Sequence, residues 1–240
     1  MNEIRLDGSP LKLARAEGVV YLLIILLGIF VELFVRGRII AGGDAAATAA
    51  NLTAMQSLWR VGIVAELLMV VCTVCSALFL YLLLKPVSRH LALLATFFGL
   101  TGLIVEAGYA LYLVEALFPL LNAAAQKAFT AEQLQALTYL TLKTHGNGFG
   151  IALFLFGPAF LIRGWLVARS RYFPKVVGRL YQLAGVAYLV NSLVLLLAPQ
   201  YAGRVFAAVA GPGFIGEVTF CLWLLIKGLN VDEWNEYPRT

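Results

Sequence analysis

Six long stretches of apolar residues run along the chain, and each one ends at charged residues, a proline or a glycine. The hydrocarbon core of a bilayer is about 30 Å thick, so a helix that crosses it needs about 20 predominantly apolar residues. The pattern therefore predicts six membrane-spanning helices. They lie near residues 14–35, 58–84, 91–118, 149–167, 176–198 and 212–229.

Two of the segments between these spans contain signals for short helices. Asp44 follows Gly42 and Gly43 and is a good N-cap for an alanine-rich helix over residues 45–56. Further on, Thr130-x-x-Gln133 has the spacing of a capping box and predicts a second short helix that reaches residue 143. These helices would lie on the outer face.

The starts of two later spans can also be read from the sequence. His145 lies in Thr-His-Gly-Asn-Gly, and we expect this segment at the outer start of the fourth span, where His145 either caps the helix or faces a pocket. Pro212 lies between two glycines and suits the first turn of the sixth span, where its missing N–H is no loss.

The composition supports a membrane protein and excludes a water-soluble one. Of the 240 residues, 61% are apolar and 13% are charged, and the mean hydropathy is +0.87. A chain of this size cannot bury so much apolar surface in one core, so lipid must cover it. No basic patch interleaved with aromatic residues occurs, and no nucleic-acid partner is expected. We predict an all-α integral membrane bundle that forms a single six-helix domain over residues 1–240.

The distribution of Lys and Arg predicts the orientation. Cytoplasmic loops of membrane proteins carry an excess of these residues. Here most of them lie in the N-terminal segment, the loops after the second and fourth spans, and the C-terminal segment, including Arg5 and Arg239. Both termini should therefore be cytoplasmic, in an inner membrane. Three tryptophans near the span ends, Trp59, Trp165 and Trp223, are expected to be interfacial anchors.

Several glutamates fall inside the predicted spans. A charge in hydrocarbon costs at least about 2.5 kcal/mol, so such residues usually face a bundle interior or a water-filled cavity. Four different spans place an acid in the outer half of the membrane. These acids are Glu32, Glu66, Glu106 and Glu217. Glu115 and Glu17 are closer to the span ends and are expected to be solvated rim charges.

Helical spacing indicates which groups accompany these acids. Glu66, Glu106 and Glu217 share helix faces with glycines and small or polar residues, which allow close helix approach. Crowded carboxylates cannot all ionise unless a cation compensates them, and the outer-side arginines placed to do so are Arg60 and Arg204. The predicted ligand-binding set is Glu32, Glu66, Glu106, Glu217, Asn191, Arg60, Tyr109 and Tyr188.

This set leaves three functional hypotheses open. The first is an outward-facing pocket for proton-linked or cation-linked binding or transport of a small cationic or amphiphilic ligand. The second is an intramembrane metal enzyme in which a divalent metal binds His145, Glu66, Glu106 and Glu217. The third is a partner subunit whose polar core is structural. No catalytic motif occurs, so no catalytic residue is predicted and binding is favoured over catalysis. The oligomeric state is open.

Several motifs occur along the chain: Arg15-Ala-Glu-Gly-Val-Val-Tyr21, Gly43-Asp44-Ala, Leu58-Trp-Arg60-Val-Gly62, Leu80-Tyr81-x-Leu-Leu-Lys85-Pro86, Tyr172-x-Pro174-x-x-x-Gly178, Gly185-x-x-Tyr188-Leu-Val-Asn191-Ser192, Pro212-x-Phe-Ile-Gly216-Glu217 and Trp223-Leu-Leu-Ile-Lys227-Gly228. Together these motifs resemble a bacterial multi-pass membrane family known as domain of unknown function 4386. The resemblance runs over nearly the whole chain and implies six membrane helices without implying an activity. It draws attention to Glu217, Arg60 and His145 but assigns them no role.

Overall fold

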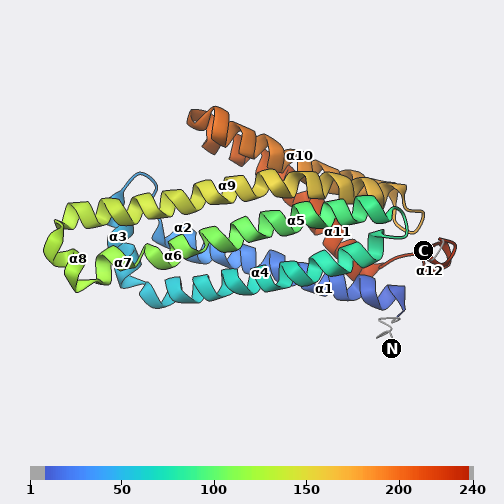
Figure 1. The fold of residues 1–240 in the computed structure, drawn as a ribbon, viewed down its shortest axis with the longest axis horizontal. Helices are drawn as coiled ribbons and strands as arrows, with labels where there is room; N and C mark the ends of the chain where they lie inside the picture. The colour runs from blue at the N-terminus through green and yellow to red at the C-terminus, as the bar shows by residue number, and fades with distance from the viewer. Residues whose placement is uncertain (1–8, 238–240) are drawn as a thin grey trace. The chain divides into compact units, whose positions relative to one another are not determined.

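The computed structural model describes residues 9–237, and no β-strand occurs among them (Figure 1). The protein is an all-α membrane protein in which six helical segments are long and apolar enough to cross a bilayer. They are Pro10–Ile39, Gln56–Leu84, Arg89–Leu121, Ala131–Arg169, Lys175–Leu197 and Pro199–Ile226.

The described residues form fourteen helical elements, in which η1 is a π-helix and η2 a 3₁₀-helix. In chain order they are α1 (Pro10–Ile29), η1 (Phe30–Arg36), α2 (Gly37–Ile39), α3 (Ala45–Ala54), α4 (Gln56–Leu84), α5 (Arg89–Tyr109), α6 (Leu111–Glu115), α7 (Phe118–Leu121), α8 (Ala123–Ala128), α9 (Ala131–Arg169), α10 (Lys175–Leu197), η2 (Pro199–Tyr201), α11 (Ala202–Ile226) and α12 (Val231–Asn235). Three of them, α3, α8 and α12, lie outside the six long segments.

The predicted helix starts are confirmed at two caps. The Asp44 side chain accepts a hydrogen bond from the backbone N–H of Ala47 at 2.8 Å, and α3 follows it. At the start of α9, the Thr130 N–H donates to the Gln133 side chain at 2.9 Å, and the Gln133 N–H donates to the Thr130 hydroxyl at 3.3 Å. This reciprocal pair is the predicted capping box.

Two other helix starts were predicted wrongly. His145 lies inside α9, because the helix that begins after the capping box continues without a break into the fourth span. At about 1.5 Å per residue the 39 residues of α9 extend for about 58 Å, which is longer than the hydrocarbon core is thick. Pro212 lies inside α11, which begins at Ala202. In membrane helices, neighbouring groups can satisfy the carbonyl that such a proline leaves free.

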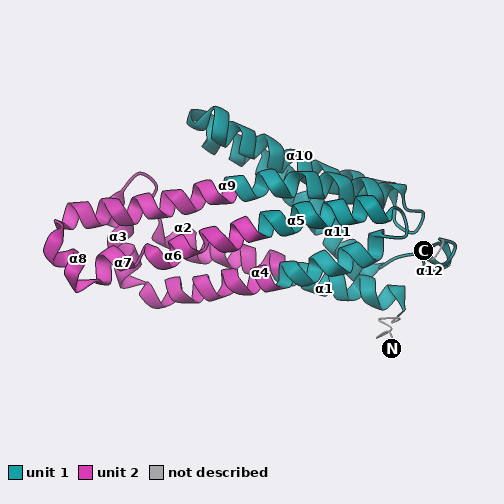
Figure 2. Cartoon of the chain, in the orientation of Figure 1, with its two compact units in different colours: residues 1–23, 72–103, 150–240 teal, residues 24–71, 104–149 magenta. Residues whose placement is uncertain are grey.

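The chain forms two compact units, coloured separately in Figure 2. Unit 1 contains residues 1–23, 72–103 and 150–240, and unit 2 contains residues 24–71 and 104–149. The boundary between them falls within α1, α4, α5 and α9.

Unit 1 gathers both ends of the described chain at one end of its helices. The Tyr172 hydroxyl, in the loop between α9 and α10, donates to the carbonyl of Leu83 near the end of α4 at 2.7 Å. The Tyr172 carbonyl in turn accepts from the N–H of Asn230, beyond α11, at 3.1 Å. Gly228, at φ +69°, lies against Leu11 at the start of α1. The first and last described helices therefore share this end with the α4–α5 and α9–α10 loops.

Close backbone contact brings α9, α10 and α11 together in unit 1. A Cβ at Gly178 would overlap the backbone of Ala168, and one at Gly216 would overlap the carbonyl oxygen of Leu180. Only glycine fits at such approaches, which are typical of helix pairs in membranes.

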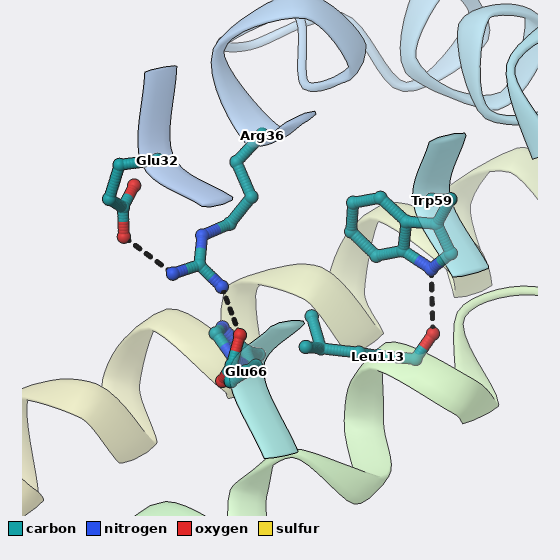
Figure 3. A network of polar contacts seen from close by, with 6 residues as sticks. Glu32, Arg36, Trp59, Glu66 and Leu113 are labelled. Atoms are coloured by element: carbon teal, nitrogen blue, oxygen red, sulfur yellow. Dashed lines mark hydrogen bonds and ion pairs between the residues drawn. The ribbon is translucent and has the colours of Figure 1, made fainter. Parts of the chain in front are cut away.

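Unit 2 has a hydrophobic core around Trp59. Trp59 is 1% exposed, and its Nε1–H donates to the carbonyl of Leu113 at 2.9 Å (Figure 3). The prediction that Trp59 is an interfacial anchor was therefore wrong. Its ring packs with aliphatic side chains from several segments, and its N–H finds a partner, as buried indoles usually do. The core comprises Val35, Ile39, Leu52, Trp59, Leu113, Ala116, Leu117 and Leu142.

Candidate functional site

The polar centre of unit 2 begins in the π-helix η1. The N–H of Gly37 donates to the carbonyl of Glu32, five residues before it, which is the π-helical pattern. π-helical turns occur mostly as short insertions in α-helices and are frequent at functional sites. This segment carries both Glu32 and Arg36.

The guanidinium of Arg36 connects two carboxylates (Figure 3). Its Nη2 donates to Oε1 of Glu32 at 2.6 Å, and its Nη1 donates to Oε2 of Glu66 on α4 at 2.7 Å. The Glu32 side chain is 54% exposed, whereas that of Glu66 is 1% exposed. The arginine therefore bridges an exposed acid and a buried one.

The other oxygen of Glu66 meets His145. The Nε2 atom of His145, on α9, lies 3.1 Å from Oε1 of Glu66. Both side chains are buried. The two oxygens of Glu66 are held by different helical segments, because Arg36 belongs to η1 and His145 to α9. A buried carboxylate with a partner at each oxygen is satisfied as an ionised group.

Glu106 lies near this network but is not bonded to it. It is 7% exposed, and it interacts electrostatically with Glu66 and Arg36. Within residues 9–237 its side chain makes no ion pair or hydrogen bond. Tyr109, one turn further along α5, packs edge-on against the His145 ring with centroids 4.6 Å apart. Glu106 is thus a buried acid near Glu66, and the guanidinium of Arg36 that pairs with Glu66 also pairs with Glu32.

The charges of this network do not balance when every acid is ionised. Arg36 is the one guanidinium in the network, and its positive charge is already shared between Glu32 and Glu66. Glu106 adds a third carboxyl group. Glu32 is 54% exposed and solvent screens its charge, so the buried acids are Glu66 and Glu106. When both are ionised and His145 is neutral, one buried negative charge has no counter-charge, which is a costly state that a proton or a cation would relieve.

The cation in this network differs from those predicted. The arginines expected to compensate the acids, Arg60 on α4 and Arg204 on α11, are both exposed, and Arg36 pairs with Glu66 instead. The sequence presents Arg36 in Arg36-Gly37-Arg38, which looks like the end of a span. Its separation of four residues from Glu32 predicts an ion pair between these two side chains. No pattern of neighbouring residues indicates that Arg36 also pairs with Glu66.

The remaining predicted residues belong to unit 1. Glu217, on α11, accepts hydrogen bonds from Tyr188 on α10 and from Tyr21 on α1, the latter at 3.0 Å. The hydroxyls of Tyr21 and Tyr181 lie 3.3 Å apart, which extends the hydrogen-bonded chain. Asn191 is buried on α10. Glu217 is therefore held by phenols, whereas Glu66 is held by an arginine and a histidine.

Glu17 is buried, and its expected position at a solvated rim was wrong. It is 0% exposed on α1, and its Oε1 accepts from the Ser76 hydroxyl at 2.7 Å. Glu115, in contrast, is exposed as expected. Composition near a span end could not distinguish them, because the difference lies in which helix packs against each residue.

The described residues form no group of three or more His, Cys, Asp or Glu side chains that could hold a metal ion. Of the predicted metal ligands, His145, Glu66 and Glu106 belong to unit 2 and Glu217 belongs to unit 1. His145 is already directed at Glu66. This donor set does not fit a divalent metal.

Comparisons with known proteins give a family but no activity. The model of a family described as "Domain of unknown function (DUF4386)" matches residues 16–228. An "Uncharacterized protein" of Archaeoglobus fulgidus is 30% identical to the chain over 174 residues, which is 71% of this chain and 86% of that protein. No solved structure matches the chain.

Proposed function

This chain belongs to the family described as "Domain of unknown function (DUF4386)", and we propose that it is a multi-pass membrane protein that binds a proton or a small cation at Glu106. The match confirms the family resemblance that the sequence motifs indicated. The family description carries no activity, so the proposal depends on the residues of unit 2.

The observation that carries the proposal is the position of Glu106. It is buried next to Glu66, and Arg36 and His145 already occupy both oxygens of Glu66. Ionisable residues inside membranes are expensive to bury and are usually functional, as parts of ion paths or proton relays. A carboxyl group that lacks a cationic partner of its own is suited to accept a proton or a cation and to release it.

The surroundings of Glu106 favour a small ligand. A Cβ at Gly148 would come within 2.6 Å of the Tyr109 Cβ, so α9 and α5 lie in close contact there. The Tyr109 ring also packs against His145. Such packing favours a proton or a small cation over the larger amphiphilic ligand that the sequence left open.

Arg36 and His145 would set the strength of binding in this arrangement. They hold Glu66 next to Glu106, so the negative charge of Glu66 attracts a cation to Glu106, while Arg36 limits that attraction. Any change in the contact between Arg36 and Glu66 would therefore change the affinity of Glu106. This coupling is how binding at the site could be linked to transport or sensing.

We also propose that the termini face the cytoplasm of a cell with an inner membrane. The end of unit 1 that holds both ends of the described chain also carries Lys85, Arg89, Arg171 and Lys175 in or beside its loops. Positively charged loops favour the cytoplasmic side. Arg5 and Arg239, which the sequence prediction also counted, lie outside the described residues.

Thermal unfolding in mild detergent tests the proposal. Wild-type protein is compared with Glu106→Gln, and with Glu115→Gln as a matched control, because Glu115 is exposed in the same membrane segment. The variables are pH and the concentration of Na⁺ or methylammonium, with choline chloride holding ionic strength constant. At a cation concentration about 100 times Kd, Tm should rise by roughly 5–10 °C in the wild type and the control.

In Glu106→Gln we expect this cation response to vanish. If the bound cation is a proton, the wild type shows no response to Na⁺ or methylammonium, and its Tm depends on pH in a way that Glu106→Gln alters and Glu115→Gln does not. The proposal is wrong if Glu106→Gln has the same cation and pH responses as the wild type.

A further inference from the structure

Unit 1 contains a cavity that the proposed function does not use. Its volume is about 400 Å³, within the range of roughly 300–1,000 Å³ that is usual for small-molecule sites. Residues 171–174, in the loop between α9 and α10, line it together with Trp223 near the end of α11 and residues 227–230 beyond that helix. All of these residues belong to unit 1, so the cavity is a feature of that unit alone.

Backbone contacts hold the two segments that line the cavity. At the end of α11 the N–H of Gly228 donates to the carbonyl of Trp223 at 2.8 Å, and Gly228 turns the chain at φ +69°, a conformation that favours glycine. Two residues further on, the Asn230 N–H donates to the carbonyl of Tyr172 at 3.1 Å. The chain beyond α11 is thereby fastened to the α9–α10 loop, and α12 follows it at this end of unit 1 (Figure 1).

The polar side chains that line the cavity offer hydrogen-bond donors. Lys227 and Arg171 are cationic and exposed, and the indole N–H of Trp223 has no partner among residues 9–237. The side-chain oxygen of Asn230 accepts from two N–H groups at the start of α12, which leaves its NH₂ group to donate elsewhere. Among the residues that the structure describes, no acid lines the cavity. The lining therefore suits a ligand that is anionic and rich in acceptors.

The two cations of the cavity differ in how far they are already paired. Nε of Arg171 lies 3.4 Å from Oε2 of Glu233, and its Nη2 lies 3.0 Å from Oε2 of Glu236. These pairs are largely exposed and therefore weak, and a guanidinium has further N–H donors. Lys227 makes no ion pair within the described part of the chain. The cavity thus holds one unpaired positive charge and a second that is shared.

The position of the cavity at the ends of membrane helices indicates a source for such a ligand. It lies where α9 ends, α10 begins and α11 ends, and each of these helices belongs to a segment that can cross a membrane. Trp223 is half-buried in the last turn of α11, and tryptophans at span ends usually lie at the level of the lipid headgroups. Basic pockets at this level bind anionic headgroups.

We infer that this cavity binds a phosphate group, with Lys227 as its counter-charge and with Arg171, Trp223 and Asn230 as further hydrogen-bond donors. A phosphodiester carries one negative charge and presents acceptor oxygens, which matches this lining. The group belongs to the headgroup of an anionic phospholipid or to a free phosphate compound, because the same chemistry serves both. The site uses residues of unit 1 alone and does not depend on the function proposed for Glu106.

Native mass spectrometry of the full-length protein in mild detergent tests the inference. The probes are phosphatidylglycerol, which is anionic, phosphatidylcholine, which has a phosphodiester but no net charge, and inorganic phosphate. We expect the wild type to bind one phosphatidylglycerol per chain more tightly than phosphatidylcholine. In Lys227→Gln the Kd for phosphatidylglycerol should rise about fivefold, the effect of removing one cation near a membrane surface. Lys85→Gln is the matched control, because Lys85 is exposed at the end of α4 and does not line the cavity.

A second pair of variants removes a donor without changing the charge. Trp223→Phe keeps an aromatic ring but lacks the indole N–H, so it should also bind phosphatidylglycerol more weakly than the wild type. Trp165→Phe is its control, because Trp165 is partly exposed on α9 and does not line the cavity. Nonspecific attraction between a basic surface and an anionic lipid would not distinguish these two variants.

Inorganic phosphate distinguishes the two sources. If a lipid headgroup occupies the cavity, inorganic phosphate does not displace phosphatidylglycerol. If the site takes a free phosphate, inorganic phosphate binds to the wild type and this binding weakens in Lys227→Gln but not in Lys85→Gln. The inference is overturned if the wild type neither prefers phosphatidylglycerol to phosphatidylcholine nor binds inorganic phosphate. It is also overturned if Lys227→Gln and Trp223→Phe both bind as their controls do.

Discussion

Nη1 of Arg36 donates to Oε2 of Glu66 at 2.7 Å, although thirty residues separate the two positions in the chain. The same guanidinium donates to Glu32 one turn earlier in its own π-helix, and the other oxygen of Glu66 meets His145. Arg36, Glu66 and His145 are buried or half-buried in helical segments of a membrane protein, whereas Glu32 is exposed. The position of Arg36 therefore determines how the negative charge of unit 2 is distributed.

Replacing Arg36 with Gln should strongly destabilise the protein. Removing one partner of a buried ion pair leaves the other charge uncompensated, at a cost of about 3–5 kcal/mol. Thermal or denaturant unfolding in mild detergent measures the change in the free energy of unfolding. Arg60→Gln is the matched control, because Arg60 is exposed on α4, and we expect it to stay within about 0.5 kcal/mol of the wild type. Equal effects of the two substitutions would contradict the pairing of Arg36 with Glu66.

Trp59→Phe should also reduce stability, by a different mechanism. Phenylalanine keeps most of the apolar contacts but lacks the Nε1–H that donates to Leu113. The carbonyl would then lose a buried partner, at a cost of about 1–3 kcal/mol. Trp165→Phe, at a position that is 37% exposed, should cost less. If Trp165→Phe is the more destabilising of the two in the same unfolding assay, Trp59 does not hold the core of unit 2 as described.

Tyr172 should make stability depend on alkaline pH. Burial raises the pKa of its phenol above the ordinary value of 10.0, and the nearby Tyr237 raises it further. The folded state therefore favours the neutral phenol, so its contribution is complete below pH 10 and is lost as the pH rises above 10 toward the folded-state pKa. Tyr172→Phe also loses the hydrogen bond to Leu83, worth about 1 kcal/mol.

Unfolding measured from pH 8 to pH 11 checks this expectation. The difference in stability between wild type and Tyr172→Phe should shrink above pH 10. Tyr201→Phe, at a position that is 51% exposed, serves as the control and should follow the wild-type pH profile. A constant difference between wild type and Tyr172→Phe across this range would argue against a buried neutral phenol.

The proposed orientation predicts which cysteine substitutions are labelled from outside intact cells. In a background with Cys72, Cys75 and Cys221 replaced by Ala, Lys85→Cys should resist a membrane-impermeant maleimide. Lys127→Cys, one predicted span further along, should react with it. Lysis should make Lys85→Cys reactive, which controls for burial. The opposite pattern would place the termini outside.

Local signals in the sequence were sufficient for the helical framework. Asp44 and the pair Thr130 and Gln133 specify helix starts through contacts three residues apart, so their pattern can be read directly. Long apolar runs likewise identify all six segments that can cross the membrane. The continuation of α9 through His145 and of α11 through Pro212 could not be found in this way, because glycine and proline are tolerated inside membrane helices.

The polar network required information that the sequence pattern does not contain. An α-helical period of 3.6 residues misplaces side chains that follow a π-helix, so the rotation of Arg36 toward Glu66 could not be derived. Arg60 and Arg204 were predicted instead because both were expected on the outer side, in the half of the membrane that holds the acids. Glu17 was misjudged for a similar reason, since its burial depends on helices distant in sequence such as the one that carries Ser76.

Infrared spectroscopy of the purified protein in lipid tests the central claim most directly, because it detects the protonation state of carboxyl groups. Spectra of the wild type, Glu106→Gln and Glu115→Gln are compared across pH, with and without Na⁺ or methylammonium. We predict a signal from the buried Glu106 carboxyl group, which is either that of a protonated group or that of a carboxylate that changes on cation binding. This signal should be present in the wild type and in Glu115→Gln and absent in Glu106→Gln. Spectra of Glu106→Gln that match those of the wild type under all conditions would contradict it.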